Sequence, residues 1–134
     1  MDNQKCVLVI DKTLPQGLIA NTAAVLTLSL GKLHPELIGA DNINNDGEVH
    51  SGITSIPIPI LASSPESIKS IRNSLKEETT LVDFSNVAQS TKNYQDYSEK
   101  LASTKAEDIE YLGIAVYGTK KIVNKYTGNL GLIR

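Results

Sequence analysis

The sequence predicts an α/β layered fold with a mainly parallel sheet. Four expected strands alternate with four expected helices along the chain, an order that is typical of helices layered over a sheet. The first apolar run, residues 5–10, has no polar alternation, which indicates a strand covered on both faces. A length of 134 residues corresponds to about one domain, so we expect a single domain over residues 1–134.

The first helix and the segment after it are marked by proline, asparagine and glycine. A helix is expected over residues 15–30, because Pro15 suits a first helical turn and apolar residues recur at helical spacing. Gly31 is expected to end this helix. The Asn-Asp-Gly stretch at 45–47 predicts a tight turn with a positive φ angle.

A proline-rich strand is expected next, over residues 53–61. Isoleucines at 56, 58 and 60 alternate as they do in a strand. Because Pro57 and Pro59 cannot donate to a β ladder, this strand is expected to have one unpaired side or to lie at a sheet edge.

The C-terminal half continues the alternation of helices and strands. Ser64 and Pro65 predict the start of a helix, with Ser64 as its cap. Ser85 is expected to cap a further helix that runs to about residue 101. The remaining expected elements are a strand at 79–84, a loop at 103–108, a strand at 110–117 and a short helix ending at Tyr126.

Charge and composition exclude several classes of protein. The formal net charge of -2 argues against a strongly basic nucleic-acid binder, and no DNA partner is expected. A local basic cluster is interpreted as a solvated helix face, with an RNA-contacting patch as the alternative. This cluster consists of Lys120, Lys121 and Lys125, near Tyr117 and Tyr126.

Cysteine content and hydropathy limit the kinds of site and the cellular location that we expect. Cys6 is the one cysteine of the sequence, which excludes an internal disulfide framework and a multi-cysteine metal site. No apolar stretch reaches the roughly 18 residues of a membrane helix, and the N-terminus does not read as a signal peptide. We therefore expect a soluble, cytoplasmic protein with no membrane partner, no metal and no cofactor.

Two residues are candidates for proton transfer. His50 lies between a turn and a strand, where an imidazole with a pKa near neutrality can act as a general acid or base. Asp11 ends the first strand, and ligand sites in open α/β sheets gather at the carboxyl ends of strands. No glycine-rich phosphate loop and no Gly-x-Ser-x-Gly elbow accompany them.

Three further residues are candidates for ligand binding. Asn21 and Thr22 interrupt an otherwise apolar helix near its N-terminus, where free backbone N–H groups also point. The alternative is that these two side chains lie at the solvent edge of the helix or hydrogen-bond a neighbouring loop. Ser51, which directly follows His50, is the third candidate for ligand binding.

Both ends of the sequence resemble the type-two peptidyl-tRNA hydrolases. The strand Lys5-Cys6-Val7-Leu8-Val9-Ile10 and the stretch Gly17-Leu18-Ile19-Ala20-Asn21-Thr22 match the family at the N-terminus. Leu112-Gly113-Ile114 and the later Lys125-Tyr126-Thr127-Gly128-Asn129-Leu130-Gly131-Leu132 match it at the C-terminus. The resemblance implies three layers, with a four-stranded mixed sheet, helices on both faces and a last strand antiparallel to the others. It also implies a homodimer, in which a partner subunit would cover residues 56–60.

Departures from that family fall on its functional positions. Leu18 stands where the family has its catalytic lysine, and a leucine cannot polarise a substrate oxygen. Thr22 and Val25 replace the family's glutamine and histidine, and Thr13 replaces its aspartate. The resemblance therefore implies the fold more strongly than the activity.

A second resemblance includes the middle of the chain. A combination of three motifs is similar to a bacterial domain-of-unknown-function family, number 2000, within the type-two peptidyl-tRNA hydrolase-like superfamily. The matching motifs are Leu14-Pro15-Gln16-Gly17-Leu18-Ile19-Ala20-Asn21, His50-Ser51-Gly52 and Ile56-Pro57-Ile58-Pro59.

Three functional hypotheses follow. The first is a divergent protein without the standard activity, which binds a small molecule where Asp11, Asn21, Thr22 and His50 converge. The second is a hydrolase of a peptidyl- or aminoacyl-tRNA ester, in which His50 or Asp11 does the chemistry and the tRNA acceptor end is the partner. The third is a dimeric interaction module without chemistry, which an exposed apolar patch would favour.

Overall fold

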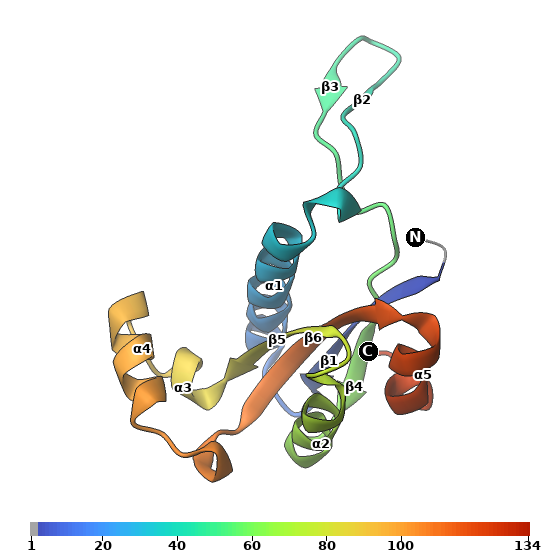
Figure 1. The fold of residues 1–134 in the computed structure, drawn as a ribbon. Coiled ribbons are helices and arrows are strands. Elements are labelled where there is room, and N and C mark those ends of the chain that lie inside the picture. Colours follow the sequence, from blue (N-terminus) through green and yellow to red (C-terminus); the bar gives the residue numbers. More distant parts are fainter. Residues whose placement is uncertain (1–2) are drawn as a thin grey trace.

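The computed structural model describes residues 3–134 and has a four-stranded sheet at its centre (Figure 1). In sheet order the strands are β4 (Ile60–Ser63), β1 (Gln4–Asp11), β6 (Tyr111–Thr119) and β5 (Thr80–Ser85). The helices are α1 (Gln16–Leu33), α2 (Pro65–Leu75), α3 (Asn86–Gln89), α4 (Tyr94–Ala102) and α5 (Lys120–Thr127). Short 3-10 turns lie at η1 (Pro35–Leu37) and η2 (Ala106–Asp108). Within this described part, none of the helices combines the length and apolar character needed to cross a bilayer.

The sheet is mixed, with β6 running against the other three strands. β1 and β4 are parallel, whereas β6 pairs antiparallel with both β1 and β5. A four-stranded mixed sheet with an antiparallel last strand is therefore confirmed. The expectation of a mainly parallel sheet is wrong at the level of hydrogen-bonded pairs. β1 and β4 form the single parallel pair described, because β6 lies between β1 and β5, which run in the same direction.

Helices cover both faces of the sheet, which confirms the layered arrangement (Figure 1). On one face, Leu8 and Ile10 of β1 pack in the same cluster as Leu26 of α1. On the other face, Val7 and Val9 pack with residues of α2 and α5. Successive side chains of a strand point to opposite faces. The uninterrupted apolar run of β1 therefore reflects burial on both sides, as predicted.

The first helix extends past its predicted end. α1 continues through Gly31 to Leu33, and the His34 N–H still donates to the Leu30 carbonyl at 2.9 Å. Proline disfavours helical geometry in the residue before it. Pro35, rather than Gly31, therefore ends this helix.

The predicted proline-rich strand is much shorter than expected. Only Ile60–Ser63 forms a strand, β4, at one end of the sheet order. The preceding residues 55–59, which we call the proline strap, run beside β1 without a ladder. Ile56 and Ile58 of the strap pack against the chain's own buried residues. The strand begins after Pro59 because prolines supply no N–H to the ladder.

A two-stranded hairpin projects from the body of the molecule (Figure 1). It consists of β2 (Asn42–Ile43) and β3 (Val49–His50). Gly47 at its tip has a φ angle of 84°, which confirms the predicted positive-φ turn. The Asn44 side-chain oxygen accepts hydrogen bonds from the backbone N–H groups of Asp46 and Glu48, at 2.9 and 3.1 Å. The hairpin is therefore ordered by its own turn.

The helix expected after β5 is divided into two. α3 ends after one turn, and Ser85 makes no side-chain capping bond. α4 then starts afresh at Asn93, whose side chain accepts from the Asp96 N–H at 2.8 Å. Asparagine is a strong N-cap residue, so a new helix start at this position is favoured over a continuous helix. The predicted Ser64 cap of α2 is confirmed, since its hydroxyl accepts from the Ser67 N–H at 3.2 Å.

Close packing of α1 on β6 yields a stability prediction. A Cβ atom on Gly113 would lie 2.9 Å from the Thr22 methyl carbon and 3.2 Å from the Val9 carbonyl oxygen. We expect Gly113→Ala to lower the free energy of unfolding by about 1–3 kcal/mol, because overpacked cores shift backbone and rotamers. Adding Thr22→Ser removes the methyl group and should recover part of that loss. Urea unfolding of the native chain, the two single variants and the double variant measures the coupling between positions 22 and 113. Strictly additive losses of unfolding free energy would contradict this prediction.

Candidate functional site

Asp11 lies at the carboxyl end of β1, as expected, but its carboxylate serves the local turn. The residue is 6% exposed, and one carboxylate oxygen accepts from the Thr13 N–H at 2.9 Å and the Thr13 hydroxyl at 2.7 Å. Such a turn is a common structural use of aspartate. This geometry explains the bend between β1 and α1 without a ligand.

The two candidates on α1 differ in their surroundings. Thr22 is fully buried, and its hydroxyl donates to the Leu18 carbonyl at 2.7 Å, one turn earlier in the helix. Asn21 is exposed. The Thr22 proton is thus used within the helix, and the position of Asn21 matches the solvent-edge alternative.

His50 and Ser51 lie far from Asp11. Both are exposed at the hairpin, where the His50 Nε2 atom is 3.0 Å from the Asn44 side-chain nitrogen. The hairpin follows the end of α1, whereas Asp11 precedes its start (Figure 1). A helix of 18 residues is about 27 Å long. The structure therefore does not bring His50 and Asp11 together within one chain, and a role for either residue stays a separate prediction.

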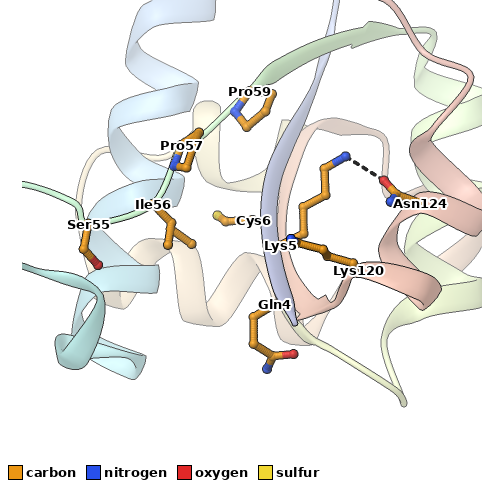
Figure 2. Close-up of a pocket in the computed structure, with 9 residues that line it drawn as sticks. All are labelled: Gln4, Lys5, Cys6, Ser55, Ile56, Pro57, Pro59, Lys120 and Asn124. Atoms are coloured by element: carbon orange, nitrogen blue, oxygen red, sulfur yellow. Dashed lines mark hydrogen bonds between the residues drawn. The ribbon is translucent and has the colours of Figure 1, made fainter. Parts of the chain in front are cut away.

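A cavity lies at the other end of β1, beside its first residues. It is a cavity of about 640 Å³ between the first half of β1, the proline strap and the start of α5 (Figure 2). It wraps around the edge of the strand, so residues from both faces of β1 line it. These residues are Gln4, Lys5, Cys6, Ser55, Ile56, Pro57, Pro59, Lys120 and Asn124.

The cavity exists because the β1–β4 ladder starts late. Its first bond runs from the Leu8 N–H to the Pro59 carbonyl at 2.9 Å. The bond from the Lys12 N–H to the Ser63 carbonyl, at 3.1 Å, continues the same ladder. Even-numbered residues of β1 therefore direct their backbone groups toward β4. Before Leu8, the same side of the strand faces the cavity.

Two ammonium groups give this cavity its charge. Lys5 donates from Nζ to the Asn124 side-chain oxygen at 2.6 Å, which fixes its position at the wall (Figure 2). Lys120 lines the same space, and none of the nine lining residues is acidic. Across residues 3–134, neither lysine lies within 4.0 Å of a carboxylate oxygen. The site therefore carries positive charge on a chain whose net charge is -2.

Cys6 contributes an apolar wall. Burial raises the pKa of the Cys6 thiol from 9.0 to about 11, and the residue is 1% exposed. A thiol with this pKa is protonated at neutral pH, so it is a weak nucleophile. The interpretation of Cys6 as a buried structural thiol agrees with this geometry.

These lining residues were not predicted as a site. Lys5 was assigned to a strand, and Lys120 to a solvated helix face. They are far apart in sequence and meet only because β1 pairs with β6, which leads into α5. The one available signal was the pair Pro57 and Pro59, which indicated a strand with an unpaired side.

A known protein family matches nearly the whole chain. The model of a family described as "Protein of unknown function (DUF2000)" matches residues 4–134. The chain belongs to this family. Membership of family number 2000, predicted from the motifs, is thereby confirmed. Neither this match nor the structural one supports placing the DUF2000 chain among the peptidyl-tRNA hydrolase-like proteins.

A solved structure shares the architecture of this DUF2000 chain. It is a protein of unknown function from Agrobacterium tumefaciens, with a TM-score of 0.89 and 21% sequence identity. The match covers 98% of this chain and 98% of that chain. At this identity the likeness establishes the fold alone. No similar sequence was found among curated proteins.

The raised thiol pKa yields a prediction about pH. In the unfolded chain the Cys6 thiol loses its proton near its ordinary pKa of 9.0, whereas in the folded chain it does so near 11. Between these values the unfolded state binds fewer protons, so stability falls as pH rises. We expect the unfolding free energy of the native chain to fall more steeply than that of Cys6→Ala, by up to about 1.4 kcal/mol per pH unit. Parallel slopes from pH 8 to 11 in urea titrations would contradict this.

Proposed function

We propose that this chain is a small-ligand-binding protein and that the cavity beside the first half of β1 is its site. The observation that carries the proposal is the pair Lys5 and Lys120, two ammonium groups in one cavity with no acidic lining residue. A cavity that holds unbalanced positive charge favours an anionic ligand. The volume of about 640 Å³ falls within the range typical of small-molecule sites.

The remaining walls indicate what else the ligand contains. Ile56, Pro57, Pro59 and the protonated Cys6 thiol form an apolar surface beside the charged end. Burial of an apolar group there contributes roughly 25 cal/mol per Å² of surface removed from water. The ligand that fits is therefore a small organic anion with an apolar part.

Binding is favoured over ester hydrolysis at this cavity. A hydrolase needs a general base or an activated nucleophile within reach of its substrate. The nine lining residues include no histidine and no carboxylate, and Cys6 is protonated at neutral pH. The tRNA-ester alternative would instead have to use Asp11 or His50 at separate places on the molecule.

The place of the family within the peptidyl-tRNA hydrolase-like superfamily is part of the same proposal. It is supported by the sheet, in which the last strand runs against the other three. Leu18 at the position of the catalytic lysine supports a member that has kept the fold and changed its chemistry.

The anion site is tested with a panel of small carboxylates and phosphate monoesters in a thermal-shift assay. We expect apolar carboxylates to raise the melting temperature of the native chain. Lys120→Gln should weaken the binding of the best probe about tenfold, because it removes one of two charges from the cavity. Lys121→Gln is the matched control, since Lys121 is exposed on the same helix and does not line the cavity.

Two results would contradict the proposal. One is that no anion in the panel shifts the melting temperature at millimolar concentration. The other is that Lys120→Gln and Lys121→Gln weaken binding equally, which would reduce the effect to general surface charge.

A second candidate function is a dimeric interaction module, which we infer from exposed apolar side chains. Leu28 on α1 is 81% exposed, and Ile53 beside the hairpin is 78% exposed. A groove of about 380 Å³ between α1 and residues 37–58 connects the two regions. α1 carries only one charged residue, Lys32. A second copy of the chain would cover this uncharged surface, since soluble monomers rarely expose large apolar patches.

The dimer is tested by sedimentation velocity over a range of protein concentrations. We expect self-association in the native chain and a weaker association constant, by tenfold or more, for Leu28→Lys. Tyr94→Lys is the control, because Tyr94 is 80% exposed on α4, away from the groove. A native chain that sediments as a monomer at every concentration would contradict this candidate.

A further inference from the structure

We propose that the outer edge of β5 pairs antiparallel with β5 of a second copy of this chain, so that the two sheets join into one continuous sheet. The inference goes beyond the functions proposed above, because it uses neither the cavity beside β1 nor the groove beside Leu28. It is carried by the backbone of β5, which lies at one end of the sheet order (Figure 1).

The two edges of the sheet differ in how they are covered. At the β4 edge, the Ala62 N–H donates to the Gly131 carbonyl at 2.8 Å, and the Ile133 N–H donates to the Ile60 carbonyl at 2.9 Å. The C-terminal segment of the chain therefore covers β4. At the other edge, β5 pairs with β6 on its inner side, and no segment among residues 3–134 supplies backbone bonds to its outer side.

The ladder of β6 determines which groups of β5 point outward. The Leu8 N–H donates on the β4 side of β1, so Leu8 exchanges no bonds with Ala115, which lies opposite in β6. Bonded and non-bonded pairs alternate along an antiparallel ladder. Ala115 therefore turns its N–H and C=O toward Val82, its partner in β5. By the same alternation, Leu81 and Asp83 turn theirs to the outer edge.

These outward groups are open to a partner strand. Leu81 and Asp83 are only half-buried, and no acceptor among residues 3–134 bonds the N–H of either residue. β5 is six residues long and contains neither proline nor lysine. Proteins normally block a sheet edge with a very short strand, a lysine, a proline or a covering segment, and an unblocked edge is a template for strand pairing. The β5 edge has none of these four protections.

A second copy of β5 supplies the matching groups. If two copies pair about a two-fold axis at Val82, Leu81 of each lies opposite Asp83 of the other, and each such pair exchanges two hydrogen bonds. The two Val82 side chains then meet on the face that α1 covers, where Val82 already packs with apolar residues. A register centred on Asp83 would place two carboxylates directly opposite each other, which is unfavourable.

The charges near this axis are compatible with a second copy. On one face, the Asp83 carboxylate lies 3.0 Å from the Arg72 Nε atom, so each copy brings a balanced pair. On the other face, α1 has no charged residue from 16 to 31. A two-fold contact therefore joins balanced charge on one face and an uncharged stretch of helix on the other.

The experiment is backbone amide hydrogen exchange of the full chain by NMR, at about 20 μM and about 1 mM, a range that spans weak association. We expect the Leu81 and Asp83 amides to exchange at least about tenfold more slowly at the higher concentration, because association closes their hydrogen bonds. The amides of Thr80, Val82 and Phe84 are bonded to β6 and should be protected at both concentrations. Association through the groove beside Leu28 would give no such alternation.

A matched pair of variants provides the second readout. Val82→Lys places two lysines opposite each other at the axis, and we expect it to weaken association at least about tenfold in sedimentation velocity. Protection of the Thr80 and Phe84 amides shows that the sheet of this variant is intact. Leu28→Lys is the control, because it adds the same charge at a position that is 81% exposed and outside β5. It should leave the protection of Leu81 and Asp83 at the native level.

Three results would overturn the pairing. The first is fast exchange at Leu81 and Asp83 at both concentrations, which would leave the edge to a strand of another protein or to water. The second is slow exchange at both concentrations in a chain that sediments as a monomer, since the groups would then be bonded within one copy. The third is a native dimer that Leu28→Lys dissociates and Val82→Lys does not, which would assign self-association to the groove.

Discussion

The antiparallel pairing of β1 with β6 is the constraint on which the rest of the structure depends. It joins the two ends of the chain, from the pair Gln4 and Thr119 to the pair Ile10 and Gly113. One edge of β1 is thereby paired with β6 from Gln4 to Ile10. Only the other side remains for β4, and β4 occupies only the second half of it. The open first half follows from this unequal use of one strand.

The same pairing determines the chemistry of the open half. β6 leads directly into α5, so Lys120 and Asn124 arrive beside the start of β1. Asn124 holds the Lys5 ammonium in place with a neutral oxygen rather than a carboxylate. Among residues 3–134, no carboxylate oxygen lies within 4.0 Å of that ammonium group. This distinguishes it from Arg72, whose charge is paired with Asp83 at 3.0 Å.

Sequence reasoning predicted features that depend on local chemistry. The double burial of β1, the Ser64 cap and the positive φ angle of Gly47 all follow from neighbouring residues, and all are confirmed. The end of α1 was placed at Gly31 because the stronger signal, Pro35, lies outside the apolar pattern. The break between α3 and α4 was missed because Asn93 acts as a cap inside a stretch with helical spacing.

The site was harder to predict for a physical reason. Its residues come from three segments, and only strand order brings them together. Asp11 was favoured by the general position of ligands in parallel sheets, but its carboxylate is used by Thr13. Pro57 and Pro59 did signal an unpaired edge. What they could not indicate is that the strand left open is β1 rather than β4.

The most direct test of this account is to map where a small organic anion binds, with backbone amide NMR of the full chain titrated with 4-methylpentanoate, a carboxylate with an apolar part. The account predicts the largest shift changes at Cys6, Ile56 and the residues that begin α5, with little change at Asp11 or His50. Changes centred on Asp11 and Asn21, or on the hairpin around His50, would contradict it.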